Sequence, residues 1–189
     1  MKRNIEQEIR ENWFKNHIAT LEQHGDLEVL IWREPGTTCY SCRYVFDGDK
    51  MYISGDIGAA VFWLTWKADV HSFYGKHINY FYEKLEAYSG DRYDFNNEKA
   101  IKQLREWLKD MKEYVAEYDH NEMKELFDDV RNCSSYPDWI QIWNDRYDFL
   151  AEIDPDCAEQ LHDLGSEITA RVQGYLIGLK MASEQLKKQ

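Results

Sequence analysis

The chain has 189 residues, a formal charge of −12 at pH 7 and a hydrophobic fraction of 43%. This hydrophobic fraction excludes a chain that is disordered throughout, and no apolar run reaches the roughly 20 residues needed to cross a bilayer. A general nucleic-acid-binding protein is expected to be basic, so the negative charge argues against that class. The first residues lack the apolar segment of a secretory signal, which predicts a cytoplasmic protein.

The N-terminal part of the sequence changes from a helical to a strand-like pattern. Residues 4–23 predict a helix, because apolar residues recur at three- and four-residue steps. Short β-rich runs then predict three strands, over 27–32, 39–46 and 51–54. Asp47 and Gly48 form a turn pair between the last two of these runs. The apolar run 59–66 predicts either a fourth strand or a buried helical turn.

After residue 76 the apolar residues follow the spacing of helices. The predicted helices cover about 78–88, 97–118, 121–132, 136–150, 155–165 and 166–186. We therefore expect an α+β fold: an N-terminal helix, a small antiparallel sheet of three or four strands, and a C-terminal helical bundle. The expected division is 1–76 for the helix and sheet and 77–189 for the helical part, packed together as one unit.

Four cysteines in a chain without a signal sequence indicate reduced thiols. Cys39 and Cys42 have the C-x-x-C spacing of some zinc and redox sites. On a regular strand, however, residues three apart point to opposite faces. The spacing therefore favours structural thiols, and we expect neither a metal nor a cofactor.

The negative charge is concentrated in one part of the chain. Residues 113–163 contain fifteen Asp and Glu but three Lys and Arg, whereas the remaining residues balance to zero. Crowded carboxylates repel one another and destabilise a compact fold. Two interpretations remain open: a solvated face that keeps the protein in solution, or a contact surface for a basic partner. In the second, rows of carboxylates imitate the phosphates of a nucleic acid.

On the contact-surface hypothesis, the carboxylates of this segment bind the partner, and nearby tyrosines serve as anchors of the interface. The candidate partner-binding residues are Glu113, Glu117, Asp119, Glu122, Glu125, Asp128, Asp129, Asp145, Asp148, Tyr114, Tyr118 and Tyr147. Reversing the charges at 122, 125, 128 and 129 together is expected to slow association without unfolding the protein.

Two further functions are alternatives. The segment 54–58, SGDIG, is either a turn that needs positive φ or the place of a catalytic Asp56 near a sheet end. In the second case the protein would be a small hydrolase or nuclease that acts on nucleotides or nucleic acid. None of the common catalytic motifs is present, so an enzyme is the weaker hypothesis. Direct nucleic-acid binding would use N-terminal basic residues such as Arg33 and Arg43, if folding separates them from the neighbouring acids.

One block carries a resemblance. Residues 32–36 (WREPG), 44–48 (YVFDG) and 52–62 (YISGDIGAAVF) resemble a block found in small proteins from phages, plasmids and gut bacteria of the Firmicutes. The resemblance implies a phage or mobile-element accessory protein, a class in which anti-defence proteins such as anti-CRISPR inhibitors of Cas9 are prominent. It carries no site residues with it. The implied partner is a basic nucleic-acid-handling protein in the host cytosol, such as a CRISPR nuclease.

Overall fold

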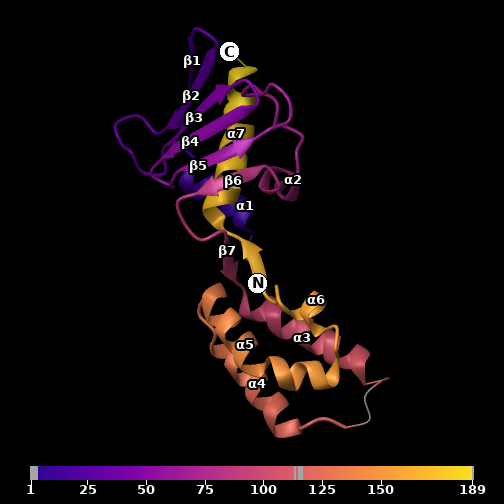
Figure 1. The fold of residues 1–189 in the computed structure, drawn as a ribbon. Helices are drawn as coiled ribbons and strands as arrows, with labels where there is room; N and C mark the ends of the chain where they lie inside the picture. Colours follow the sequence, from indigo (N-terminus) through magenta and orange to yellow (C-terminus); the bar gives the residue numbers. More distant parts are fainter. Residues whose placement is uncertain (1–3, 113, 115–116, 189) are drawn as a thin grey trace. The chain divides into compact units, whose positions relative to one another are not determined.

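A computed structural model describes residues 4–112, 114 and 117–188 (Figure 1). The chain forms two compact units: the first comprises Met1–Arg92 and Ile168–Gln189, and the second comprises Tyr93–Glu167. The C-terminal helix therefore belongs to the same unit as the N-terminal sheet. The boundary expected near residue 76 lies within the first unit.

The first unit is built around an antiparallel sheet of six strands, in which each strand pairs with the next one along the chain. Its elements are α1 (Ile5–Glu8), the π-helical turn η1 (Ile9–Trp13), β1 (Ile18–His24), β2 (Leu27–Arg33), β3 (Cys42–Asp47), β4 (Lys50–Gly55), β5 (Ala60–Trp63), α2 (Ile78–Tyr82), β6 (Leu85–Tyr88) and α7 (Ala170–Leu186).

The predicted sheet of three or four strands after an N-terminal helix is wrong. The last six residues of the predicted helix 4–23 belong to strand β1, which pairs with β2 over all seven of its residues. Ile18 and Leu21 satisfy the helical spacing, but they are 47% and 39% exposed, so their spacing does not reflect a buried helical face. The end of the predicted helix 78–88 is the sixth strand, because Leu85 pairs with Phe62 across the sheet.

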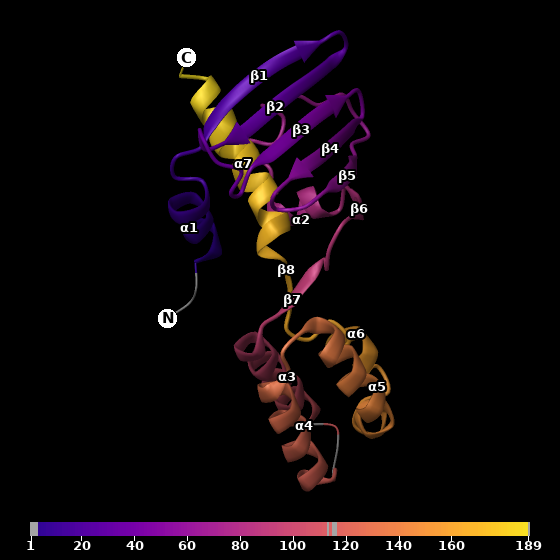
Figure 2. The same ribbon diagram turned by 90° about the vertical axis from the view of Figure 1, so that its left-hand side faces the viewer.

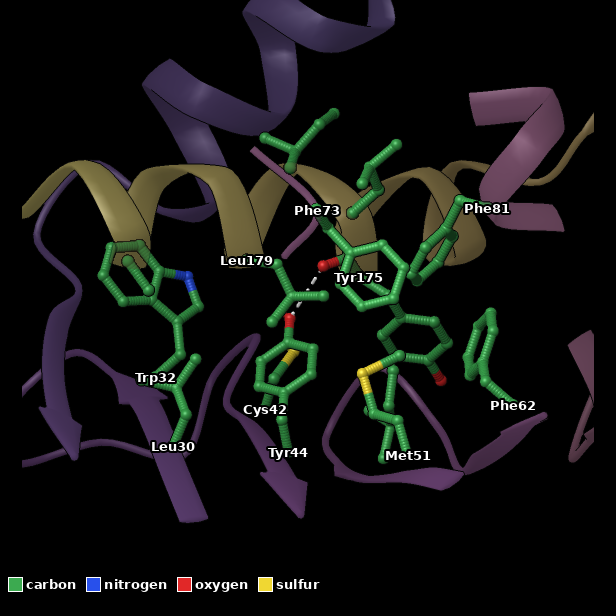
Figure 3. Close-up of a cluster of buried hydrophobic side chains, with 14 of the residues drawn as sticks. Leu30, Trp32, Cys42, Tyr44, Met51, Phe62, Phe73, Phe81, Tyr175 and Leu179 are labelled. Carbon is green, nitrogen blue, oxygen red and sulfur yellow. Dashed lines mark hydrogen bonds between the residues drawn. The ribbon is translucent and has the colours of Figure 1, made fainter. Parts of the chain in front are cut away.

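The core of the first unit lies between one face of the sheet and α7 (Figures 2 and 3). Tyr44 of β3 donates its hydroxyl to the carbonyl of Tyr175 at 3.0 Å, and Tyr175 donates to the carbonyl of Ile57 at 3.1 Å. Buried residues occupy nearly all sides of α7, which is typical of a helix enclosed in a core. Gly178 permits this close approach, because a Cβ there would lie 2.6 Å from the Tyr44 hydroxyl.

The second unit has its own helical core. Its elements are β7 (Tyr93–Phe95), α3 (Asn97–Met111), α4 (His120–Asn132), α5 (Tyr136–Ile153), α6 (Cys157–Leu161) and β8 (Ser166–Ile168), whose last residue belongs to the first unit. Polar side chains cap three of these helices: Asn96, Asp119 and Ser135 each accept a hydrogen bond from a backbone N–H of the first turn. The predicted starts of α3, α4 and α5 are confirmed to within one or two residues.

Within the described ranges of the chain, no helix is both long and apolar enough to span a membrane.

Candidate functional site

The negative charge of the protein follows the division into units. The second unit contains twenty Asp and Glu but eight Lys and Arg, which gives a formal charge of −12. The first unit contains fifteen of each sign and is neutral. The whole formal charge of the protein therefore lies in one folded unit, and this unit contains the acidic segment 113–163.

Three candidate carboxylates of α4 are paired within the second unit. The guanidinium of Arg146, on α5, lies 3.5 Å from Glu122, 3.2 Å from Glu125 and 3.0 Å from Asp129. These residues follow one another at three- and four-residue steps, so they share one face of α4. The face meets α5 and is partly neutralised there, which makes it a contact between two helices of the unit.

Two other candidates of this region also have local partners. Asp128 forms an ion pair with Arg131, one turn further along α4. Asp119 caps α4 by accepting the N–H groups of Asn121 at 2.8 Å and Glu122 at 3.2 Å. A reversal of the four carboxylates from 122 to 129 would thus break the pairs with Arg146 and Arg131. Loss of stability would then be mixed with loss of binding, so those positions give an ambiguous test.

A second row of carboxylates lies on α5 and faces solvent. Asp138, Asp145, Asp148 and Glu152 are exposed and are separated by seven, three and four residues. This spacing places them on one side of the helix, and at 1.5 Å per residue the row is about 21 Å long. Among the described residues, no ion-pair or hydrogen-bond partner is found for the side chains of Asp145, Asp148 and Glu152. We call these four residues the α5 acidic row.

The N-terminal end of the α5 acidic row borders a shallow hollow of about 320 Å³ between α4 and α5. Asp129, Asp138 and Asp145 contribute carboxylates to its wall, and Ile142 contributes an apolar surface. The hydroxyl of Ser134, followed by that of Ser135, lowers the pKa of Asp138 below its ordinary value, so this carboxyl remains ionised. An apolar wall beside carboxylates fits a Lys or Arg side chain, whose stem is apolar and whose head is cationic.

The candidate tyrosines differ in their surroundings. Tyr147 is exposed on α5 beside Asp148, and its ring centroid lies 5.5 Å from that of the buried Trp143. Tyr118 packs against the core of the second unit. Tyr114 is exposed, as is Glu117. Glu113 lies outside the described residues. Of the three tyrosines, Tyr147 is the one held on the same helix as the α5 acidic row.

The sequence does not mark Arg146 as a site residue, and the candidates named above leave out Asp138 and Glu152, which belong to the same acidic segment. Arg146 could have been found from the three carboxylates at three- and four-residue steps on a predicted helix, since such a face needs a cation. Glu152 continues the spacing of Asp145 and Asp148 along the next predicted helix. The signal for Arg146 depends on placing two helices side by side, which the sequence does not specify, whereas the signal for Glu152 lies along one helix.

The segment 54–58 forms a turn in which Asp56 has a structural partner. Gly55 and Gly58 have φ values of +145° and +114°. The carboxylate of Asp56 accepts the backbone N–H of Tyr40 at 2.8 Å, and it thereby ties the loop before β3 to the turn after β4. Throughout the described part of the chain, no group of three or more His, Cys, Asp and Glu side chains is placed to hold a metal ion. The geometry therefore offers Asp56 a role in joining two loops.

The C-x-x-C pair is divided between a turn and a strand. Cys39 is exposed in the turn before β3, whereas Cys42 is buried in β3, and all four cysteines are free thiols. Burial raises the pKa of Cys42 to about 12. Burial also raises the pKa of Cys133 and that of Cys157. These three thiols are therefore both shielded and protonated near neutral pH.

We expect iodoacetamide at pH 8 to modify one thiol of the folded protein rapidly, and that thiol is Cys39. Only the thiolate reacts, so burial and a raised pKa protect the other three cysteines. Intact-mass spectrometry measures the number of adducts, and Cys39→Ser should remove the fast adduct. Rapid modification of two or more thiols in the native protein would contradict the burial of Cys42, Cys133 and Cys157.

Comparisons with models of known protein families, with curated proteins and with solved structures find no match for this chain. The arguments for function therefore come from the charge and geometry of its two units.

Proposed function

We propose that this protein acts by binding, and that the α5 acidic row docks on a basic surface of a nucleic-acid-handling protein. The observation that carries the proposal is the row itself: Asp145, Asp148 and Glu152 are exposed on one side of α5, and no described residue neutralises them. Like charges so close together destabilise the helix that carries them. A cationic partner would relieve that repulsion, and the association would be electrostatically steered.

The proposed mode of action is inhibition by nucleic-acid mimicry. Duplex DNA presents one negative charge for every ~1.7 Å of its axis, and a row of carboxylates along a helix offers a sparser version of that pattern. A protein occupying the nucleic-acid channel of a nuclease in this way would keep the natural substrate out. We propose an accessory protein of a phage or mobile element that works in the host cytosol as an inhibitor of the anti-CRISPR type, with a CRISPR nuclease as partner.

The geometry also indicates how discrimination would arise. The hollow beside Asp138 and Asp145 can receive one Lys or Arg side chain, and Tyr147 offers a ring next to the row. A partner with cations at matching spacing would be preferred over a generally basic protein, because specificity depends on the pattern of contacts as well as on total charge.

The test reverses the charge of three unpaired carboxylates of the row. One variant combines Asp145→Lys, Asp148→Lys and Glu152→Lys. We expect its association with a purified Cas9–guide complex, followed by biolayer interferometry at 50 mM salt, to be at least about tenfold slower than that of the parent protein, since steering depends on local charge. Inhibition of DNA cleavage should fall in parallel.

A matched control carries the same change in charge elsewhere. Glu83, Glu86 and Asp91 are exposed in the first unit, and Glu83→Lys, Glu86→Lys and Asp91→Lys also change the net charge by six. This variant should bind almost as the parent does. Equal losses in both variants would mean that total charge alone matters. Unchanged binding in the row variant would leave the row as a solvated face.

A further inference from the structure

The first unit has a sheet face that carries aromatic rings and cations. Side chains alternate between the two faces of a strand, so the residues opposite to the buried Tyr44, Met51 and Phe62 point away from α7 (Figures 2 and 3). The strand register aligns Val45, Tyr52 and Val61 across β3, β4 and β5 on this side. We call the side of the sheet opposite to α7 the open face.

Two aromatic side chains of the open face are exposed. Trp63 is 55% exposed and Tyr52 is 37% exposed. Tyr52 is opposite Val61, and Trp63 is opposite Lys50, so the two rings are diagonal neighbours on adjacent strands. The Cα atoms of such diagonal neighbours lie about 7–8 Å apart. The indole N–H of Trp63 donates to Asp49 at 3.0 Å, which fixes the ring in place while it stays accessible.

Cations are exposed on the open face although the first unit as a whole is neutral. Arg33, Arg43 and Lys50 lie on this face and are exposed, and none of them forms an ion pair with another described residue. Of the two acidic residues that β1–β5 place there, Glu22 is paired with His24 at 3.0 Å and Asp47 lies opposite Lys50. Asp49, in the turn between β3 and β4, accepts the indole N–H of Trp63 and adds a third carboxylate at this face. The strand partners of Arg33 and Arg43, by contrast, are uncharged: Ile18 for the first, and Ile31 and Ser54 for the second.

This combination favours one kind of occupant. A second copy related by a two-fold axis would bring the same cations against one another, which costs energy. A duplex keeps its bases stacked inside and offers none to the rings. Unpaired bases, by contrast, stack on aromatic side chains of an antiparallel sheet while cations contact the phosphates. The hydroxyl of Ser54, opposite Arg43 in the register, is suited to a ribose 2′-hydroxyl.

We propose that the open face binds single-stranded RNA, with two successive bases stacked on Tyr52 and Trp63 and the backbone contacting Arg33, Arg43 and Lys50. The second unit has a formal charge of −12 and repels the phosphates of RNA. The affinity is therefore weak and strongly dependent on salt. RNA binding makes no contact through the α5 acidic row, which belongs to the other unit.

The test measures fluorescence anisotropy of a labelled twelve-residue oligouridine with the full chain at 50 mM salt. Trp63→Ala and Tyr52→Ala should each weaken binding by roughly 5- to 100-fold, which corresponds to the loss of one stacked base. Tyr74→Ala is the matched control, because Tyr74 is also exposed in the first unit but lies beside Lys187, whose Nζ is 4.3 Å from its ring centroid. That variant should bind as the parent does.

A second variant tests the cations without touching the rings. Three phosphate contacts predict a slope of about −2 in a plot of log affinity against log salt, or roughly a 20-fold loss between 50 and 200 mM. Arg43→Gln combined with Lys50→Gln should reduce this slope to about −0.7. Circular dichroism checks that each variant remains folded, and the charge reversal of the α5 acidic row should not weaken RNA binding.

Four results would overturn the proposal. The first is the absence of an anisotropy change at 50 mM salt, and the second is equal weakening by Tyr74→Ala. The third is a parent protein that is a dimer by light scattering and becomes monomeric when both Tyr52 and Trp63 are replaced, which would assign the open face to a second copy. Tighter binding of a deoxythymidine oligomer would overturn the assignment to RNA.

Discussion

Replacing Gly55 by alanine should lower the free energy of unfolding of the first unit by roughly 3–5 kcal/mol, combining backbone strain with overpacking. Gly55 ends β4 with φ at +145°, a conformation that residues with a Cβ rarely adopt. An added Cβ would lie 2.1 Å from the carbonyl oxygen of Ser41 and 3.0 Å from the Cα of Cys42. Both contacts are with backbone atoms, so relief requires β3 and β4 to move apart.

Gly48→Ala is the matched control for this prediction. Gly48 also has positive φ, at +60°, but a Cβ there would meet no atom within 4 Å. That variant should lose about 1–2 kcal/mol, the cost of the left-handed conformation alone. Urea unfolding followed by circular dichroism measures both. Equal losses would show that the contact with Ser41 contributes nothing and that Gly55 is present for its φ alone.

The result also bears on the segment SGDIG. The N–H of Asp56 donates to the same carbonyl of Ser41 at 2.9 Å, and the Asp56 carboxylate accepts the N–H of Tyr40. Gly55 and Asp56 therefore close one junction between the loop before β3 and the end of β4. Both residues therefore have a structural role at this junction.

Replacing Trp139 by alanine should destabilise the second unit by about 3–5 kcal/mol, the usual cost of truncating a buried aromatic side chain. Trp139 is fully buried on α5, and its indole N–H donates to the carbonyl of His162 at 2.9 Å. Its ring centroid lies 6.2 Å from that of Phe95 and 6.3 Å from that of Trp143. The substitution therefore leaves a cavity and also an unpartnered carbonyl.

Hydrogen exchange measures this effect separately in each unit. Each unit has its own buried core, so amides of α3–α6 should lose protection in the Trp139→Ala variant while those of β2–β4 keep it. Partner binding through the α5 acidic row should be lost together with the second unit, whereas binding of oligouridine by the first unit should persist. Equal loss of protection in both units would show that they unfold as one cooperative body.

Helices of the second unit leave a clearer signal in the sequence than the edge strand of the first unit does. The starts of α3, α4 and α5 were predicted within one residue, because caps such as Asn96 and Ser135 are local signals. The predicted end at 118 is wrong, since α3 ends at Met111. The edge strand β1 was mistaken for a helix. Its side chains at Ile18 and Leu21 are exposed, so the strand has no alternating burial to reveal it, and its identity comes from pairing with β2.

The candidate contact surface likewise has one part that is visible in the sequence and another that depends on contacts between helices. The concentration of negative charge between residues 113 and 163 was visible from composition alone. Which carboxylates remain available depends on Arg146, which reaches from α5 to three residues of α4. No local pattern in the sequence says that this arginine faces α4 rather than solvent.

The sequence by itself determined the α+β class, the starts of α3, α4 and α5 and the confinement of the net charge to one stretch, because these depend on composition and on neighbours within a few residues. The tertiary structure alone decided that the sheet has six strands, that α7 returns from the C-terminus to cover it, and which acidic and basic side chains are left unpaired. Those properties depend on contacts between residues far apart in the chain, where the free energy of pairing depends on which surfaces meet and no single segment specifies its partner.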